Sequence, residues 1–274
     1  MSPRLSGWRR LAMAGWRPPR DPQFYGELDL DATPLLAFQE DVRQATGVRV
    51  TMTHLAGRAV AHALAAVPEL RVRLARGRLR PRESVDVFFI VATGGGHELT
   101  GLKVRDADRK PVTAVAGELS ARRSRLAEGV DPELGPAKSL MARVPRWLLR
   151  PALLLSAWLT SDLDLDLSRL GLPRQPFGGA MVTSVGMWGI DRAFSPLGDF
   201  YRIPVLVLVG AVRERPVAVA GEVVARPVLT LTATFDHRYT DGFHAARFAA
   251  AVQEYCADPA RFEPPIPVKT SREY

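Results

Sequence analysis

The sequence predicts an α/β fold in which a mixed sheet is flanked by helices. Strand-like and helix-like stretches alternate along the first half of the chain, and the apolar run at residues 84–93 is typical of a strand buried on both faces. A chain of 274 residues can bury a sizeable core, in one large domain or in two small ones. Its composition, 47% hydrophobic and 24% charged, is that of an ordinary globular protein.

The first half of the chain carries the clearest start and stop signals. Thr33 is expected as the N-cap of a helix, with Pro34 at its first position and Gly47 at its end. A second helix has small residues along one face, which suggests tight packing against a sheet. The expected elements, in order, are a strand at 23–32, helices at 33–47 and 53–70, a buried strand at 84–93 and a glycine turn at 94–101.

The second half is richer in strands. The apolar alternation of residues 216–235 predicts a hairpin that turns at Gly221. The last helix is expected to begin directly after Asp241 and Gly242. The expected elements are a helix at 111–129, strands at 180–186, 204–212 and 216–235, and a helix at 243–259.

Residues 137–171 do not follow this alternation. They are apolar but carry Arg143, Arg146 and Arg150 as well as two prolines, and the uncharged run at 151–161 is too short to span a bilayer. A pair of core or interface helices is favoured over an interfacial membrane helix.

The net charge of +8 does not by itself indicate nucleic acid. The arginines are spread among acidic residues, and no helix-turn-helix, RNA-binding or finger signature is present. We therefore expect no nucleic-acid partner, although a positive potential suits any polyanionic ligand, including coenzyme A. The single cysteine, Cys256, excludes an intramolecular disulfide framework and indicates a reducing compartment. No signal peptide is visible, so a cytoplasmic location is expected.

Four of the five histidines have ordinary explanations. His54 and His62 belong to the alanine-rich helix as packing or capping residues, His97 lies in the glycine turn and His244 in the first turn of the last helix. No pair has the spacing of a zinc site with a third ligand, so we expect no metal.

His237 differs, because a buried strand ends there and a helix begins just beyond. Ligands often bind at such strand ends in α/β proteins. Asp241 is expected either to cap the following helix or to hold an arginine, such as Arg238 or one from the N-terminal arm: Arg9, Arg10 or Arg17. A well-capped connecting loop explains the pattern equally well.

Residues 229–259, LTLTATFDHRYTDGFHAARFAAAVQEYCADP, resemble the H-R-x-x-D-G signature of the catalytic domain of dihydrolipoamide acyltransferases, the second component of 2-oxoacid dehydrogenase complexes. Chloramphenicol acetyltransferase has a related H-x-x-x-D-G motif. Further segments are similar to the family in the same order, and together they cover most of residues 10–260: VTMTHLAGRAVAHALAAVPELRVR, VDVFFIVAT, VRDADRK, MVTSVGMWGID and VGAVRERPVAVAGEVVARPVLTLT.

The resemblance implies a chloramphenicol acetyltransferase-like fold and an acyl transfer between coenzyme A and dihydrolipoamide. It makes His237 the general base, since a thiol with a pKa of about 8.5 is within reach of an imidazole near 6.5. It places the donor to the tetrahedral oxyanion on Thr183, with Ser184 in the place of the family's asparagine. Asp241 would fix the loop through an ion pair, and Gly242 would allow a sharp turn.

The resemblance also implies a homotrimer whose active sites lie between subunits. His237 and Thr183 would then come from different chains. The expected organisation is a basic arm at 1–20, a catalytic domain at 21–264 with the helical insert 137–171, and a tail at 265–274. In that tail, Ile266 and Val268 could dock a neighbouring trimer in a larger assembly.

Several segments depart from the family pattern. The sequence has no lipoyl or partner-binding domain ahead of the catalytic one, so a lipoyl group would be supplied in trans by a lipoyl-domain protein or dehydrogenase component. The family's TPxGLxVPVxRDAD loop is TGGGHELTGLKVRDAD at 93–108, and its NPPQ is FYRI at 200–203. Two alternatives therefore stay open: an acyltransferase with a small-molecule acceptor, or a non-catalytic trimeric scaffold.

Overall fold

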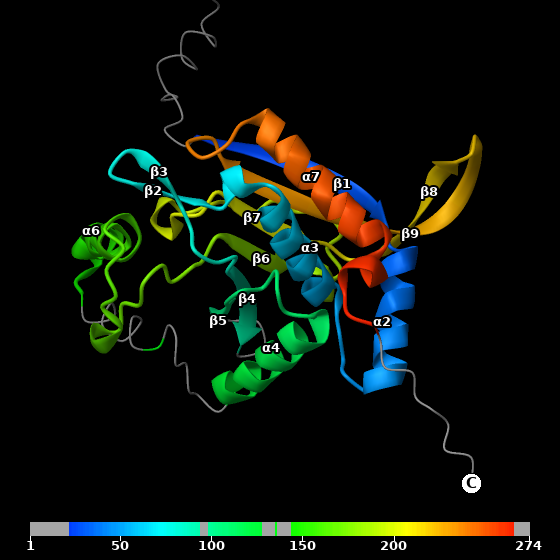
Figure 1. The fold of residues 1–274 in the computed structure, drawn as a ribbon, viewed down its shortest axis with the longest axis horizontal. Coiled ribbons are helices and arrows are strands. Elements are labelled where there is room, and N and C mark those ends of the chain that lie inside the picture. The colour runs from blue at the N-terminus through cyan, green and yellow to red at the C-terminus, as the bar shows by residue number, and fades with distance from the viewer. Residues whose placement is uncertain (1–21, 94–97, 128–134, 136–143, 266–274) are drawn as a thin grey trace, which may run out of the picture.

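A single mixed sheet organises the chain in the computed structural model, which describes residues 22–93, 98–127, 135 and 144–265 (Figure 1). Its strands follow the order β1-β9-β7-β6-β4-β5, and β8 pairs with the far end of β9. The β4–β6 and β6–β7 pairs are parallel and the others antiparallel, which confirms the predicted mixed sheet. The strands are β1 (Gln23–Asp31), β4 (Val87–Thr93), β5 (Glu98–Val104), β6 (Ala180–Ser184), β7 (Val205–Val209), β8 (Arg213–Val219) and β9 (Glu222–Asp236).

Helices cover one face of this sheet. The helices α3 and α7 pack against each other and against the sheet, and α4 and α2 flank them (Figure 1). The main core lies beneath them, and the fully buried Phe89, Leu64 and Tyr255 belong to it. The helices are α2 (Thr33–Thr46), α3 (Met52–Ala66), α4 (Val112–Ala127), α6 (Arg146–Ala157) and α7 (Gly242–Ala257).

The opposite face of the sheet is covered by chain rather than by long helices. Met181 and Leu206 lie there in a smaller apolar cluster with Phe88. Threonine hydroxyls of β9 also point to this side, where Thr232 donates to the Ala193 carbonyl and Thr234 to that of Ser195. The segment containing residues 193–195 is thereby fixed across β9.

Most predicted elements are confirmed, with small shifts. The hairpin turns as predicted, since Ala220 and Gly221 take the positive φ values, 52° and 89°, that a tight two-residue turn requires. The predicted N-cap Thr33 is wrong by one residue. Ala32 is the N-cap, and the Thr33 amide donates to the Asp31 carboxylate at 2.8 Å.

A second hairpin was not predicted. It consists of β2 (Val72–Ala75) and β3 (Arg78–Pro81), joined by Arg76 and Gly77 with φ values of 50° and 70°. Its strands are short and arginine-rich and lack a clear apolar alternation, so periodicity gives little signal.

The described part of the expected insert 137–171 contains one α-helix, α6, and residues 137–143 of the predicted helix pair lie outside the described residues. A π-helical turn follows at Trp158–Asp162 and a 3-10 turn at Ser168–Leu170. Arg73 of β2 donates to the Ser161 carbonyl at 2.8 Å, which ties the insert to the hairpin. Among the helices of the described ranges, none is long and apolar enough to cross a membrane.

Some expectations concern segments outside the described residues. They are the basic arm with Arg9, Arg10 and Arg17, the turn residue His97, the insert residue Arg143, and the tail residues Ile266 and Val268.

Candidate functional site

His237 occupies the first position after β9 and is held by its backbone. Its amide donates to the Pro22 carbonyl at 2.7 Å, next to the start of the edge strand β1. Its ring lies 5.2 Å from the ring of Phe24 and is otherwise exposed. None of the described residues forms a hydrogen bond with its ring nitrogens, so these residues leave both nitrogens open to a ligand.

An ion pair inside the loop fixes the residues on both sides of His237. Asp236 is buried, and its carboxylate accepts from Arg238 Nε at 2.9 Å and Nη2 at 2.5 Å. The hydrogen bonds that Arg238 donates to Asp236 raise the pKa of the Arg238 guanidinium. Arg238 therefore pairs with Asp236 and not with Asp241. The sequence analysis missed this pair, although an aspartate two residues before an arginine at a strand end is a visible signal.

Asp241 has the first of its two expected roles, as the N-cap of α7. One carboxylate oxygen accepts from the amides of Phe243 at 3.1 Å and His244 at 3.3 Å, and lies 2.7 Å from His244 Nδ1. These bonds, led by that of the His244 amide, lower the pKa of Asp241. The Asp241 carboxylate therefore has hydrogen-bond partners without an arginine, and all its partners among the described residues belong to α7.

Gly242 is the first helical residue of α7, and its φ is not in the left-handed region. The expected sharp turn at this glycine is therefore wrong. A Cβ added at Gly242 would meet no atom within 4 Å in this chain.

Thr183 and Ser184 are neighbours on β6 with different surroundings. The Ser184 hydroxyl donates to the Val209 carbonyl at 3.2 Å, so its proton is already used within the sheet. The Thr183 hydroxyl forms no hydrogen bond with the described residues and is half-buried. It lies on the face of the sheet that the helices leave uncovered, two residues from Met181.

Within one chain Thr183 is far from His237. Thr183 is opposite Leu208 of β7, which is opposite Thr232 of β9, five residues before His237. Five strand residues span roughly 17 Å, and two strand spacings add about 10 Å. The structure therefore does not bring these two predicted site residues together in a single chain.

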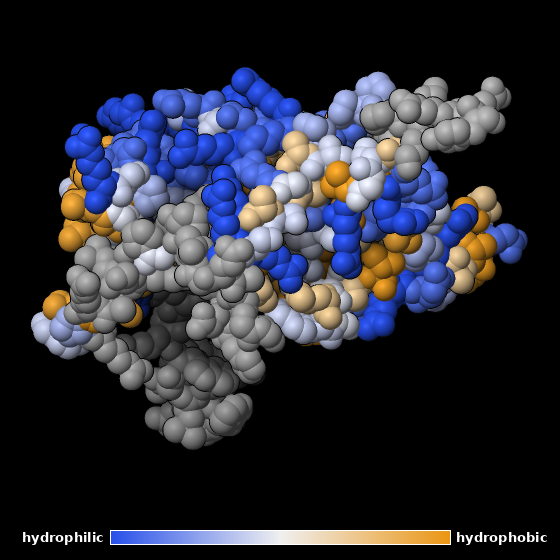
Figure 2. Space-filling model, turned by 90° about the horizontal axis from the view of Figure 1, so that it is seen from below, coloured by the Kyte–Doolittle hydropathy of each residue, from blue (hydrophilic) through white to orange (hydrophobic). Residues whose placement is uncertain are grey.

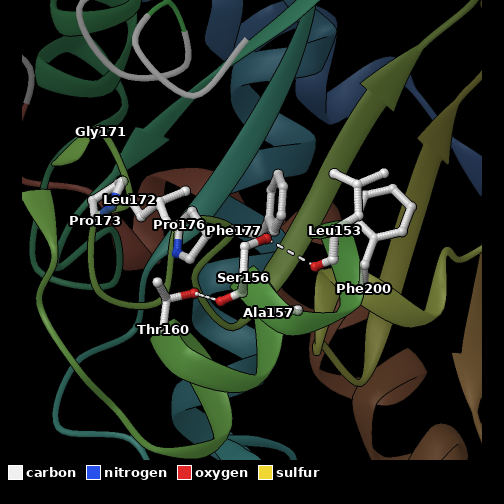
Figure 3. A pocket seen from close by; sticks show the side chains of 10 residues that line it. All are labelled: Leu153, Ser156, Ala157, Thr160, Gly171, Leu172, Pro173, Pro176, Phe177 and Phe200. Atoms are coloured by element: carbon white, nitrogen blue, oxygen red, sulfur yellow. Dashed lines mark hydrogen bonds between the residues drawn. The ribbon is translucent and has the colours of Figure 1, made fainter. Parts of the chain in front are cut away.

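Two cavities among the described residues have mostly apolar linings. One, of about 90 Å³, is enclosed by α6, residues 171–177 and Phe200 (Figure 3). Its two hydroxyls, those of Ser156 and Thr160, donate to backbone carbonyls of the same helical segment, so its wall is apolar. The other, of about 230 Å³, separates α7 from β1 and β9, and Phe24 lines it. In the described ranges, no three His, Cys, Asp or Glu side chains gather in a way that could hold a metal ion.

The comparison with known proteins identifies a family. A family model described as 2-oxoacid dehydrogenases acyltransferase (catalytic domain) matches residues 19–130 and 177–263. The unmatched residues 131–176 contain the expected insert 137–171. One relative is the dihydrolipoyllysine-residue acetyltransferase component of the acetoin cleaving system of Bacillus subtilis, 24% identical over 84% of this chain and 48% of that protein.

Solved structures share the fold. A probable dihydrolipoamide acetyltransferase from Listeria monocytogenes superposes with a TM-score of 0.64 at 17% identity, covering 100% of this chain and 98% of that one. The cubic core of a pyruvate dehydrogenase multienzyme complex gives 0.64 at 22% identity, over 89% and 84% of the two chains. These likenesses confirm the family fold that the motifs implied. The chain spans less than half the length of the first curated relatives it matches.

Proposed function

This chain belongs to the family of 2-oxoacid dehydrogenase acyltransferase catalytic domains, and from that premise we propose that it moves an acyl group between a coenzyme A thioester and a thiol such as dihydrolipoamide. The relative from Bacillus subtilis is named for acetyl transfer to a dihydrolipoyllysine residue. The proposal for this chain depends on its own residues, above all on His237.

The observation that carries the proposal is the position of His237. Its backbone is anchored by the bond to Pro22 and its neighbours by the Asp236–Arg238 ion pair, while its ring is exposed and without a hydrogen bond from the described residues. A general base needs this combination of a fixed position and a free nitrogen. In the proposed step His237 takes the thiol proton, and the thiolate attacks the acyl carbonyl. When the tetrahedral intermediate collapses, the carbon–sulfur bond to the original thiol breaks and His237 returns the proton to the departing thiolate.

The attack places negative charge on the carbonyl oxygen, which needs a donor. Thr183 suits this role better than Ser184, because the Ser184 proton already bonds the Val209 carbonyl. Losing one such donor typically costs about 3 kcal/mol of transition-state stabilisation. We assign the oxyanion donor to Thr183 and a structural role in the strand to Ser184.

The separation of His237 from Thr183 supports an active site formed between subunits. A cyclic trimer repeats one head-to-tail interface three times, so each His237 would face the Thr183 of the next chain. The exposure of His237 in the isolated chain fits such an arrangement. We propose a homotrimer that binds coenzyme A as substrate and takes the lipoyl group from another protein.

The test is acyl transfer from acetyl-CoA to free dihydrolipoamide, measured for the wild type and for His237→Ala. Loss of a general base typically lowers the rate by about 10²–10⁴-fold, so kcat should fall by that factor with the fold intact. His244→Gln is the control, because it changes a histidine seven residues away that serves the helix cap. An active His237→Ala variant, or an inactive wild type, would remove the support for this function.

A further inference from the structure

The β2–β3 hairpin exposes three arginines, Arg76, Arg78 and Arg80. No carboxylate of the described part of the chain pairs with them. Arg80 is directly opposite Arg73, and Arg78 points to the same side of the hairpin. Like charges in these positions repel each other. Arg73 is compensated by Asp164 at 3.2 Å, but the three exposed arginines are not, so an anionic surface would stabilise the hairpin.

The outer face of α6 is apolar. The exposed fractions are 77% for Trp147, 55% for Leu155 and 43% for Trp158, and their spacing places them in one stripe along the helix and its π-helical extension. The inner face is apolar too, since Leu153 and Ala157 line the cavity in Figure 3. A helix that is apolar on both faces is normally covered on both. In Figure 2 hydrophobic side chains border hydrophilic ones at the end of the molecule where α6 lies.

This surface borders the His237 loop. Arg73 joins β2 to the π-helical turn after α6 through the Ser161 carbonyl, and the Tyr239 hydroxyl lies by the backbone of Leu74 in β2. Figure 1 shows the β2–β3 hairpin between α6 and the loop that connects β9 to α7. A molecule docked on this surface would therefore stand next to His237.

We propose that Arg76, Arg78 and Arg80 together with Trp147, Leu155 and Trp158 form a docking face for an acidic carrier domain that brings its thiol arm to His237, an inference that rests on the acyl transfer proposed above. The charge of the face is positive, and residues 144–161 contain two arginines and no acidic residue. A carrier with acidic side chains around an apolar centre complements both features.

A free coenzyme A thioester does not account for the face. Its phosphates could bind the arginines, but Trp147 and Trp158 lie about 16 Å apart along the helix, too far for one small molecule to cover together with the hairpin. An anionic bilayer matches the same charge and tryptophans. A flat bilayer would, however, also cover the His237 loop beside the face, whereas a carrier domain leaves room for its arm.

The experiment compares two acceptors of acetyl groups from acetyl-CoA: free dihydrolipoamide, and an acidic lipoyl domain produced separately, lipoylated and reduced. The variant is Arg78→Glu/Arg80→Glu, and the matched control is Arg123→Glu/Arg125→Glu on the exposed side of α4, with the same change in charge. We expect the hairpin variant to lose at least tenfold in kcat/KM for the domain and nothing for free dihydrolipoamide. Added salt should lower the wild-type kcat/KM for the domain.

A second variant, Trp147→Ala, removes the most exposed apolar side chain of the face without changing the hairpin. It should also lower kcat/KM for the lipoyl domain and leave kcat/KM for free dihydrolipoamide unchanged. Equal losses in the hairpin variant and the α4 control, or an unchanged kcat/KM for the domain in both docking variants, would overturn the proposal.

Direct binding separates this proposal from the proposed function. If the wild type transfers acetyl groups to neither acceptor, the proposed acyl transfer is wrong. Titration of tryptophan fluorescence with the lipoyl domain still tests the docking in that case. Binding that is lost in Arg78→Glu/Arg80→Glu supports the face, and no binding to the wild type overturns it. Binding to phosphatidylglycerol vesicles without binding to the lipoyl domain would show that the face binds an anionic membrane and not a carrier domain, and would overturn the proposal.

Discussion

The position of His237 is fixed by its backbone and by its neighbours in the loop. Its amide is bonded to Pro22, and the next residue is locked to the buried Asp236 by a forked ion pair. The general base that we propose must be held to within a fraction of an ångström, and His237 is held through the backbone on both sides. The ring itself is thereby left available.

The sequence could predict that His237 follows a strand end and that Asp241 caps a helix, because the strand end and the helix start are both visible in the local pattern. It could not predict whether Arg238 would pair with Asp236 or with Asp241. Asp236 and Asp241 lie at similar distances along the chain, and the choice depends on Asp236 being buried at the end of β9. Similarly, the preference for Thr183 over Ser184 rests on a bond between two strands that lie 25 residues apart in sequence.

His54 makes stability depend on pH. Its Nδ1 accepts from the Thr51 amide at 3.2 Å, and burial lowers its pKa to about 4 from an ordinary value of 6.5. Because the unfolded chain binds this proton more tightly, the contribution of His54 is complete above pH 6.5 and is lost as the pH falls towards 4. Between pH 7.5 and pH 5 the wild type should lose about 2 kcal/mol through this residue.

The measurement is urea unfolding of the wild type and of His54→Gln at both pH values. A glutamine at this position can still accept from the Thr51 amide. The variant should lose less stability on acidification, by about the same 2 kcal/mol. Equal acid losses in the two proteins would show that His54 is not the group that titrates.

At the scale of elements, α3 packs unusually close to the sheet because of Gly57. A Cβ at this position would come within 2.2 Å of the Phe89 ring, which is fully buried in β4. The small residues of the helix predicted such packing, but only the structure shows which of them is indispensable.

Gly57→Ala should therefore destabilise the fold by about 1–3 kcal/mol, through overpacking against Phe89. Gly117→Ala in α4 is the matched control, since a Cβ there would meet no atom within 4 Å. It should raise the stability by up to about 1 kcal/mol. Chemical unfolding measures both, and a Gly57→Ala protein as stable as the control would contradict the packing argument.

The positions of the β2–β3 hairpin and of the insert cannot be predicted from local sequence patterns. Predicted elements such as β9 and α7 have long apolar periodicities, which local sequence expresses well. The hairpin is short and arginine-rich, so it has no apolar period that sets its orientation. The helix α6 has apolar side chains on both its outer and its inner face, so its apolar residues do not single out one buried face. Their positions come from side chains that reach across the chain, such as Arg73 to Ser161 and Arg202 to Asp162 at 3.1 Å.

At the scale of the whole molecule, long-range polar contacts close the domain. Glu263 accepts from Arg58 at 2.8 Å, from Tyr255 at 2.9 Å and from the Val112 amide at 2.6 Å, all in the interior. This one carboxylate joins α3, α4 and α7 to the chain beyond the last helix. Arg58 and Glu263 are 205 residues apart, so composition and periodicity gave no sign of the pair.

The same limit applies to the active site. The fold class follows from the alternation of elements, and the ordered motifs identify the family. The distance between Thr183 and His237 follows from strand order and register, which one chain's local patterns do not determine. That distance is the reason why we propose that catalysis uses two subunits at once.

The most direct test combines two inactive proteins. His237→Ala and Thr183→Val are co-expressed with different affinity tags, mixed trimers are purified through both tags, and acetyl transfer to dihydrolipoamide is measured. In each doubly tagged head-to-tail trimer, one of the three sites would combine an intact His237 from one chain with an intact Thr183 from the next, restoring about a third of wild-type activity. Doubly tagged trimers that remain as inactive as either variant alone would contradict a site shared between subunits.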